Sequence, residues 1–349
     1  MTVGCLYIIF FKESLVNGEW ISTNGYARII IPDTLLYSDI VDDNNIIESI
    51  TLSGVKNTFV PSFLWIISGF DWFNMLFINI GFVYLITYYM ERLANQYDIP
   101  WRKAQLAIVI FLALPTNIYY SIGALKELPM AALLLASLYY FNLRRFKLAL
   151  LMVVLLIMVR YQIAIVIFLL FISSISNKTM RASFIILLLL SAIYPLLNSL
   201  DILSQDATQS FRMDWGVANS IGSKIENIRN NYFLLSTFAV IVRCFQSLFE
   251  PIIGFFQSFT FYEYKDLSIS LITHIPSNII MLPYIYLFFK KLVYIVYIDK
   301  IIIDKVQTIY ALLLILIVLI GGFSFIHNRY LIPVYPLMII ASLIPYKRM

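Results

Sequence analysis

The sequence predicts an all-α membrane protein, a helix bundle of about ten spans, and three observations support this prediction. Of the 349 residues, 61% are hydrophobic and only 13% are charged, whereas an average soluble domain has roughly 45–50% apolar and about 25% charged residues. The apolar residues form runs long enough to cross a bilayer, such as LALLMVVLLIMV (148–159) and ALLLILIVLIGG (311–322). Lys and Arg lie mostly in the short segments between these runs.

The composition excludes several kinds of site and partner. The two cysteines, Cys5 and Cys244, cannot form a disulfide framework or a CxxC metal site, and His274 and His327 cannot form a histidine-rich metal cluster. The net charge of +5 would indicate nucleic-acid binding only if Lys and Arg gathered on a polar domain, which they do not. We therefore expect a single integral membrane domain over residues 1–349, with no nucleic-acid partner.

The apolar runs define the expected spans. The first run, VGCLYIIFF (3–11), lacks a preceding basic region and a following cleavage site, so we interpret it as a short span rather than a signal peptide. The expected helices lie at 3–11, 72–90, 104–121, 128–143, 147–159, 161–175, 182–198, 271–290, 306–322 and 330–345.

The connecting segments predict an orientation. Lys and Arg are in excess in 91–103, 144–147, 176–181, 290–305 and the C-terminal Lys347–Arg348. The positive-inside rule places all of these in the cytoplasm. The acidic segment 12–61 and the long segment 199–270 are then extracytoplasmic, and both termini are inside. Within the second segment, 231–259 is expected to form amphipathic helices on the outer leaflet.

One apolar stretch, residues 148–175, is interrupted only by Arg160 and Gln162 and is flanked on both sides by basic segments. Because both flanks belong on the same side, the stretch is expected to form a hairpin with Arg160 at its outer tip. Each arm covers only about 20 Å of a hydrocarbon core about 30 Å thick. The tip would then line a wet cavity, which makes Arg160 a functional candidate; the alternative is an arginine that snorkels at a helix end.

Several cations are expected on the outer side, where the positive-inside rule does not place them. Arg offers planar, bidentate contacts to phosphate oxygens, and Lys supplies a point charge. A phosphate-binding site on the outer side would therefore explain why these cations occur there. Contact with lipid headgroups is the alternative. The substrate-binding candidates are Lys126, Arg160, Arg243, His327 and Arg329, together with the neighbouring Tyr161 and Tyr330.

Two carboxylates are the catalytic candidates. Asp33 lies in the first outer segment, and Glu127 lies in the outer turn TNIYYSIGALKELP (116–129). A carboxylate near the membrane surface could act as the general base that deprotonates an acceptor hydroxyl. It could alternatively hold Mg²⁺ or Mn²⁺ against a diphosphate, although no clear ligand motif supports a metal. We interpret Asp42 and Asp43 as solvated loop residues.

Several motifs follow one another along the chain: D-x-x-x-Y at Asp33 and Tyr37, NMLFINIGFVYLITYYMERLA (74–94), LPTNIYYS (114–121), GALKELP (123–129) and RYLIPVYPLMII (329–340). Together they resemble the GT-C superfamily of polyprenyl-dependent membrane glycosyltransferases. The resemblance covers roughly residues 29–175 and 323–345, and the large soluble C-terminal domain of the superfamily is not expected here. The superfamily commonly has a catalytic Asp in the first outer loop and an acidic residue in the outer turn, which implies these roles for Asp33 and Glu127.

Within this superfamily the chain resembles Wzy-type polymerases of bacterial surface polysaccharides. The resemblance implies an enzyme that joins undecaprenyl-diphosphate-linked oligosaccharide repeats into O-antigen or capsule at the outer face of the inner membrane, without a required cofactor. Its partners would be the lipid-linked oligosaccharide, membrane lipids and, in the same pathway, a chain-length regulator and a flippase. Two alternatives stay open: a transferase of one sugar from a polyprenyl monophosphate, and a lipid-linked glycan flippase or transporter.

Overall fold

A computed structural model describes residues 59–69, 71–121, 126–175, 275–298, 304–323 and 331–345. Of the described residues 89% are helical and none belongs to a strand, which confirms the all-α prediction for this part of the chain. Two stretches, Phe73–Gln96 and Pro276–Ile295, are long and apolar enough to cross a membrane by length and composition. The number of about ten spans stays a prediction.

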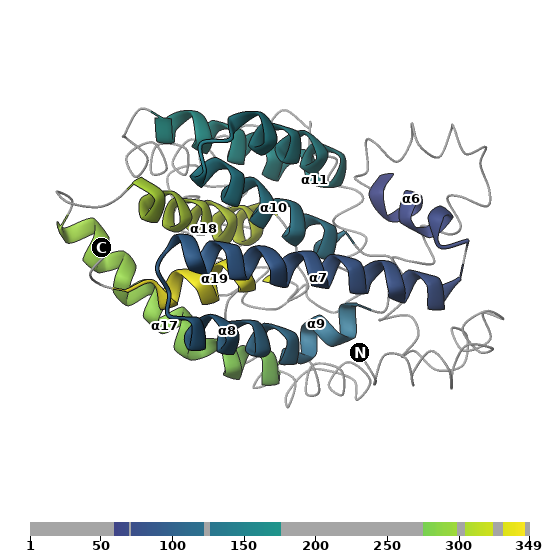
Figure 1. The fold of residues 1–349 in the computed structure, drawn as a ribbon, viewed down its shortest axis with the longest axis horizontal. Helices are drawn as coiled ribbons and strands as arrows, with labels where there is room; N and C mark the ends of the chain where they lie inside the picture. The colour runs from purple at the N-terminus through teal and green to yellow at the C-terminus, as the bar shows by residue number, and fades with distance from the viewer. Residues whose placement is uncertain are drawn as a thin grey trace, which may run out of the picture.

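Most of the helices pack side by side along a common direction, and α17 crosses them obliquely (Figure 1). Helix α10 packs most extensively against α11 and α7, and α19 contacts α17, α18, α8 and α7. The elements are α6 (Phe59–Ile67), α7 (Trp72–Gln96), α8 (Trp101–Ala113), α9 (Pro115–Tyr120), α10 (Glu127–Asn142), α11 (Phe146–Ile175), α17 (Ile275–Ile298), α18 (Asp304–Phe323) and α19 (Val334–Leu343).

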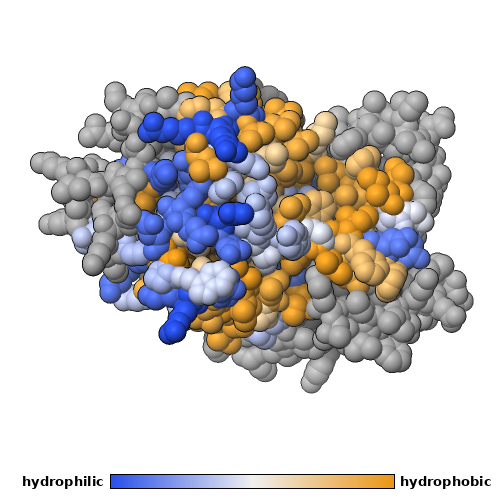
Figure 2. Space-filling view, in the orientation of Figure 1, coloured by the Kyte–Doolittle hydropathy of each residue, from blue (hydrophilic) through white to orange (hydrophobic). Residues whose placement is uncertain are grey.

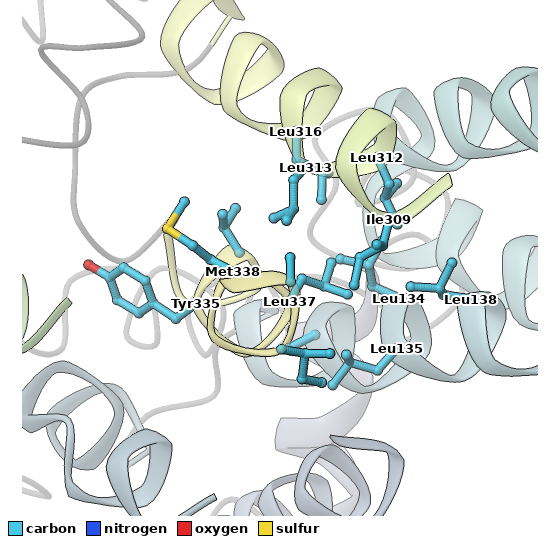
Figure 3. Packing of buried hydrophobic residues seen from close by; sticks show 14 of the residues in the cluster. Leu134, Leu135, Leu138, Ile309, Leu312, Leu313, Leu316, Tyr335, Leu337 and Met338 are labelled. Carbon is cyan, nitrogen blue, oxygen red and sulfur yellow. The ribbon is translucent and has the colours of Figure 1, made fainter. Parts of the chain in front are cut away.

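Helix α19 forms the centre of the bundle. Its residues 334–342 are all buried, as expected for a helix that is apolar on every side. Figure 3 shows Leu337 of α19 between the leucines of α10 and those of α18. The core therefore surrounds a helix of only ten residues, which is shorter than the expected span 330–345.

The expected hairpin is confirmed by the aromatic contacts of Phe141. Its ring stacks on Phe171 with centroids 4.1 Å apart and meets the edge of Phe146 at 5.7 Å. In one straight helix, residues 146 and 171 would lie about 38 Å apart, so the two arms of α11 must fold back on each other. The fold-back occurs at Arg160, where the backbone is extended with φ −160° and ψ 94°.

Other sequence-based boundaries also differ from the structure. The expected helix 72–90 continues to Gln96. The expected helix 104–121 is two helices, because Leu114 is extended ahead of Pro115, and a residue that precedes proline is disfavoured in the helical conformation. The expected loop 290–305 is helical as far as Ile298, because the apolar run after Lys291 continues the helix. Helix α6 begins at Phe59, in a region to which the sequence analysis assigned no helix.

The basic turns lie together at one end of the bundle. Asn142 donates from Nδ2 to the Tyr97 hydroxyl over 2.9 Å, and that hydroxyl donates to the Lys305 carbonyl over 3.2 Å. These bonds join the α7–α8 turn, the α10–α11 turn and the start of α18. Hydrophilic residues gather over this end in Figure 2, next to an apolar surface. We call it the basic end, and its exposed cations are Arg92, Arg102, Lys103, Arg144, Arg145, Lys147, Lys290 and Lys305.

Candidate functional site

Two of the sequence-predicted site residues from different helices lie at the end of the bundle opposite the basic end. Helix α10 starts at Glu127 and runs to Asn142, which contacts Tyr97 at the basic end. The first arm of α11 then runs back along α10 and ends at the bend at Arg160. Glu127 and Arg160 therefore lie at the same end, which we call the site end.

Glu127 is almost completely buried, with 1% of its surface exposed, and is the first residue of α10. A carboxylate in the first turn is stabilised by the positive end of the helix dipole. Pro129 is also tolerated there, because the first-turn N–H groups need no partner within the helix. The sequence KELP thus starts the helix and buries an acidic side chain. Buried charge in an apolar bundle is a functional candidate.

The two neighbouring cations are less buried than Glu127. Lys126 is half-buried and occupies the N-cap position of α10, and Arg160 is half-buried at the bend of α11. The sequence predicted Lys126 in an outer turn and Arg160 at the outer tip of a hairpin, and the structure places the two residues at the same end of the bundle. The side chain of Tyr161 and all of Asp33, Arg243, His327, Arg329 and Tyr330 lie outside the described residues.

Sequence reasoning missed a buried group of amide and hydroxyl side chains on α7, α9, α17 and α19. The Thr116 N–H donates to the Ser277 hydroxyl over 2.9 Å, and the two hydroxyls are also hydrogen-bonded to each other. The Tyr335 hydroxyl is 3.2 Å from Asn278 Oδ1, to which it donates. We call this group the polar seam; it consists of Asn79, Thr116, Asn117, Ser121, Ser277, Asn278 and Tyr335, all buried.

The seam extends to the segment that precedes α10. Asn79 in α7 donates from Nδ2 to the Ser121 carbonyl over 2.7 Å, so the seam reaches the same turn that leads into Lys126 and Glu127. Polar residues beside a proline within apolar runs, as in LPTN (114–117) and IPSN (275–278), were the available sequence signal. One such residue alone does not reveal its partner.

Asn117 supports the break between α8 and α9. Pro115 has no N–H to donate to the carbonyl of Phe111, and Asn117 Nδ2 donates to that carbonyl instead, over 2.7 Å. Leu114 N–H donates to it as well, over 3.3 Å. Asn117 is 5% exposed, and within the described part of the chain its Oδ1 accepts no hydrogen bond. The break therefore places a fixed, inward-facing amide oxygen in the seam.

The described residues contain no group of three or more His, Cys, Asp or Glu side chains that could hold a metal ion. The carboxylates of the first outer segment, including Asp33, lie outside the described ranges. The site end as described thus offers one buried carboxylate, two cations and a set of neutral hydrogen-bonding groups.

No family model matches the chain, and neither curated proteins nor solved structures are significantly similar to it.

Proposed function

We propose that the chain is a membrane glycosyltransferase that joins polyprenyl-diphosphate-linked oligosaccharide repeats at the outer face of the bacterial inner membrane. The observation that carries the proposal is the position of Glu127 and Arg160 at one end of an apolar bundle, opposite the basic end. A substrate with a lipid tail, a diphosphate and a glycan needs cations and hydrogen-bonding groups at such an end.

The surface of the described helices supports a membrane position. Large apolar side chains are exposed on α7, α8, α11 and α17, for example Tyr84, Val109, Leu151 and Val293. Soluble monomers rarely expose apolar patches of this extent. With the basic end in the cytoplasm, the site end faces outward, which suits a bundle of about ten spans with both termini inside and with amphipathic helices on the outer leaflet.

In the proposed reaction an acceptor hydroxyl attacks the anomeric carbon, the bond from that carbon to the diphosphate oxygen breaks, and the polyprenyl diphosphate leaves. Asp33 would take the hydroxyl proton as general base. Arg160, with Arg243 and Arg329, would neutralise the charge on the leaving group. Lys126 and Glu127 would position the wall of the site, and Tyr161, His327 and Tyr330 would bind phosphate or sugar.

Proteoliposomes that present lipid-linked oligosaccharide on their outer face test the reaction. A polymerase lengthens the glycan without any ion gradient, and a single-sugar transferase adds one residue from a polyprenyl-phosphate donor. A protein that moves the lipid between leaflets and never forms a glycosidic bond is not a glycosyltransferase.

Arg160→Lys tests the diphosphate contact. Lysine keeps the charge but cannot reproduce the planar fork of the guanidinium. A charge-assisted contact contributes on the order of 1.5–3 kcal/mol, so we expect the polymerisation rate to fall tenfold or more. Arg145→Lys at the basic end is the matched control and should keep full activity. Full activity and normal membrane abundance in both Arg160→Lys and Arg160→Ala would show that Arg160 only snorkels.

Asp33→Asn tests the base. The amide cannot accept the proton, so we expect a loss about as large as that of Arg160→Lys, while binding of the lipid donor is largely retained. Asp42→Asn and Asp43→Asn, in the same acidic segment, are the controls and should change the rate little. Equal losses in all three variants would assign the effect to the charge of the segment rather than to a base.

One observation favours a second candidate, a lipid-linked glycan flippase. The break between α8 and α9 places the polar seam inside the bundle, and interrupted helices line the substrate sites of many transporters. A flippase would change the sidedness of the lipid-linked glycan without lengthening it, so the proteoliposome experiment separates the two candidates.

A further inference from the structure

Buried side chains hold the basic turns in a fixed arrangement. Gln96 at the end of α7 donates from Nε2 to the Tyr139 carbonyl over 3.3 Å and accepts from Asn142 Nδ2 over 3.2 Å. Burial raises the pKa of the Tyr97 phenol, so its hydroxyl stays protonated and can donate to Lys305. The exposed cations of the basic end therefore project from one platform of hydrogen-bonded turns rather than from separate loops.

The charge of this platform is strongly positive. The cations of the basic end are all exposed, and Arg92 also stacks over the ring of Tyr88 with its guanidinium carbon 5.1 Å from the centroid. The described acidic side chains at the same end are Asp98, which is exposed, and Glu91, which is half-buried. The platform thus attracts anions.

Apolar side chains alternate with these cations. Trp101, which is 60% exposed, directly precedes Arg102 and Lys103, and Phe146, which is 47% exposed, lies between Arg145 and Lys147. The phosphate backbone of a nucleic-acid duplex or a free anion would leave such side chains in water. The boundary of a bilayer accepts both, because aromatic rings enter the headgroup layer while cations contact phosphates.

We propose that the basic end binds the headgroups of anionic phospholipids in the cytoplasmic leaflet, with Arg102, Lys103, Arg144 and Arg145 contacting the phosphates. Trp101 and Phe146 insert beside them, at the level of the glycerol backbone. This inference depends on the chain being embedded in a membrane but not on glycosyl transfer, because the surface lies at the end of the bundle opposite Glu127 and Arg160.

The test is the thermal unfolding of the full chain in an uncharged detergent, with phosphatidylglycerol or phosphatidylcholine added at matched concentrations. We expect phosphatidylglycerol to raise Tm more than phosphatidylcholine, and 0.5 M salt to remove most of the difference, since screening over a few ångströms weakens exposed charge contacts. An equal rise in Tm with the two lipids would overturn the proposal.

Two matched variants locate the surface. In the variant with Arg102→Gln, Lys103→Gln, Arg144→Gln and Arg145→Gln, each lost charge should weaken phosphatidylglycerol binding about fivefold. The charge-preserving variant with Arg102→Lys, Arg144→Lys and Arg145→Lys should keep most of the effect. The proposal is wrong if the glutamine variant folds and still distinguishes the two lipids. It is equally wrong if a DNA oligonucleotide at the same phosphate concentration stabilises the wild type as strongly as the lipid does.

Discussion

At the scale of single residues, Lys291 shows how backbone carbonyls can stabilise a buried ammonium group in this bundle. Its side chain is 5% exposed, and its Nζ donates to the carbonyls of Ser342 over 2.6 Å and Ile344 over 2.5 Å. The last carbonyls of a helix have no partner within the helix and carry its negative dipole end. Lys291 thus caps the carboxyl end of the buried helix α19.

Lys291→Met should lower the free energy of unfolding by about 2 kcal/mol, because two buried carbonyls lose their donor. Lys290→Met is the matched control, since the neighbouring ammonium is exposed, and it should change stability by less than about 0.5 kcal/mol. Thermal unfolding in detergent, compared at equal protein concentration, measures both. If Lys291→Met melts like the wild type, its ammonium does not cap α19.

At the scale of elements, α7 and α10 end in the same capping motif, with a residue in the left-handed conformation just after the helix. Asp98 and Arg144 follow these helices with φ of 53° and 58°. After α10 the Arg145 N–H donates to the Tyr140 carbonyl over 3.0 Å, and after α7 the Ile99 N–H donates to the Ala94 carbonyl over 2.9 Å. These bonds close both helices in the arrangement that usually has glycine at the left-handed position.

Arg144→Gly should therefore stabilise the protein by up to about 1 kcal/mol, because glycine adopts this conformation without steric cost. Arg144→Val should destabilise it, since a β-branched residue is strained there. Arg145→Gly removes the same charge at the next position, whose φ is not positive, and should not raise Tm. A rise in Tm for both glycine variants would indicate a charge effect instead of relief of strain.

The break between α8 and α9 is suited to a double-mutant cycle. Asn117→Ala should cost about 1 kcal/mol, because the Phe111 carbonyl loses its shorter hydrogen bond. Pro115→Ala restores an N–H that can donate to the same carbonyl, so the double variant should lose less stability than Asn117→Ala alone. Strict additivity of the two changes in Tm would show that Asn117 does not replace the missing N–H.

The sequence could predict the bend at Arg160 but not the break at Leu114, and the reason is physical. Both ends of the apolar stretch are basic and therefore belong on the same side of the membrane. A stretch with both ends on one side must fold back on itself, so the topology alone predicts the bend. Around Pro115 the apolar run continues, so the sequence pattern does not mark the break. The carbonyl that loses its helical hydrogen bond there accepts one from an amide side chain instead. The Thr116–Ser277 pair joins residues 161 positions apart, and no local pattern encodes such a contact.

At the scale of the whole molecule, the arrangement of the helices follows from contacts that are independent of any charge rule. The hydrogen bond of Tyr97 joins the end of α7 to the start of α18, and the bonds of Lys291 join α17 to the end of α19. The Tyr97 hydroxyl also accepts from Asn142 at the end of α10, so the basic turns lie at the same end as the start of α18. The positive-inside prediction and the packing therefore agree on which turns share a side for 91–103, 144–147 and part of 290–305. Segment 176–181 lies outside the described residues.

The sidedness of this arrangement can be measured by cysteine accessibility in intact cells. In a background with Cys5→Ser and Cys244→Ser, Asp42→Cys and Asn219→Cys should react with a membrane-impermeant maleimide from outside, because both belong to segments that we expect to be extracytoplasmic. Arg145→Cys at the exposed basic end should react only after the membrane is opened.

The opposite result, in which Arg145→Cys is labelled in intact cells and Asp42→Cys is not, would show that the protein has the inverse orientation. Glu127 and Arg160 would then face the cytoplasm, away from lipid-linked glycans of the outer leaflet, and the proposed polymerase would be excluded along with the orientation.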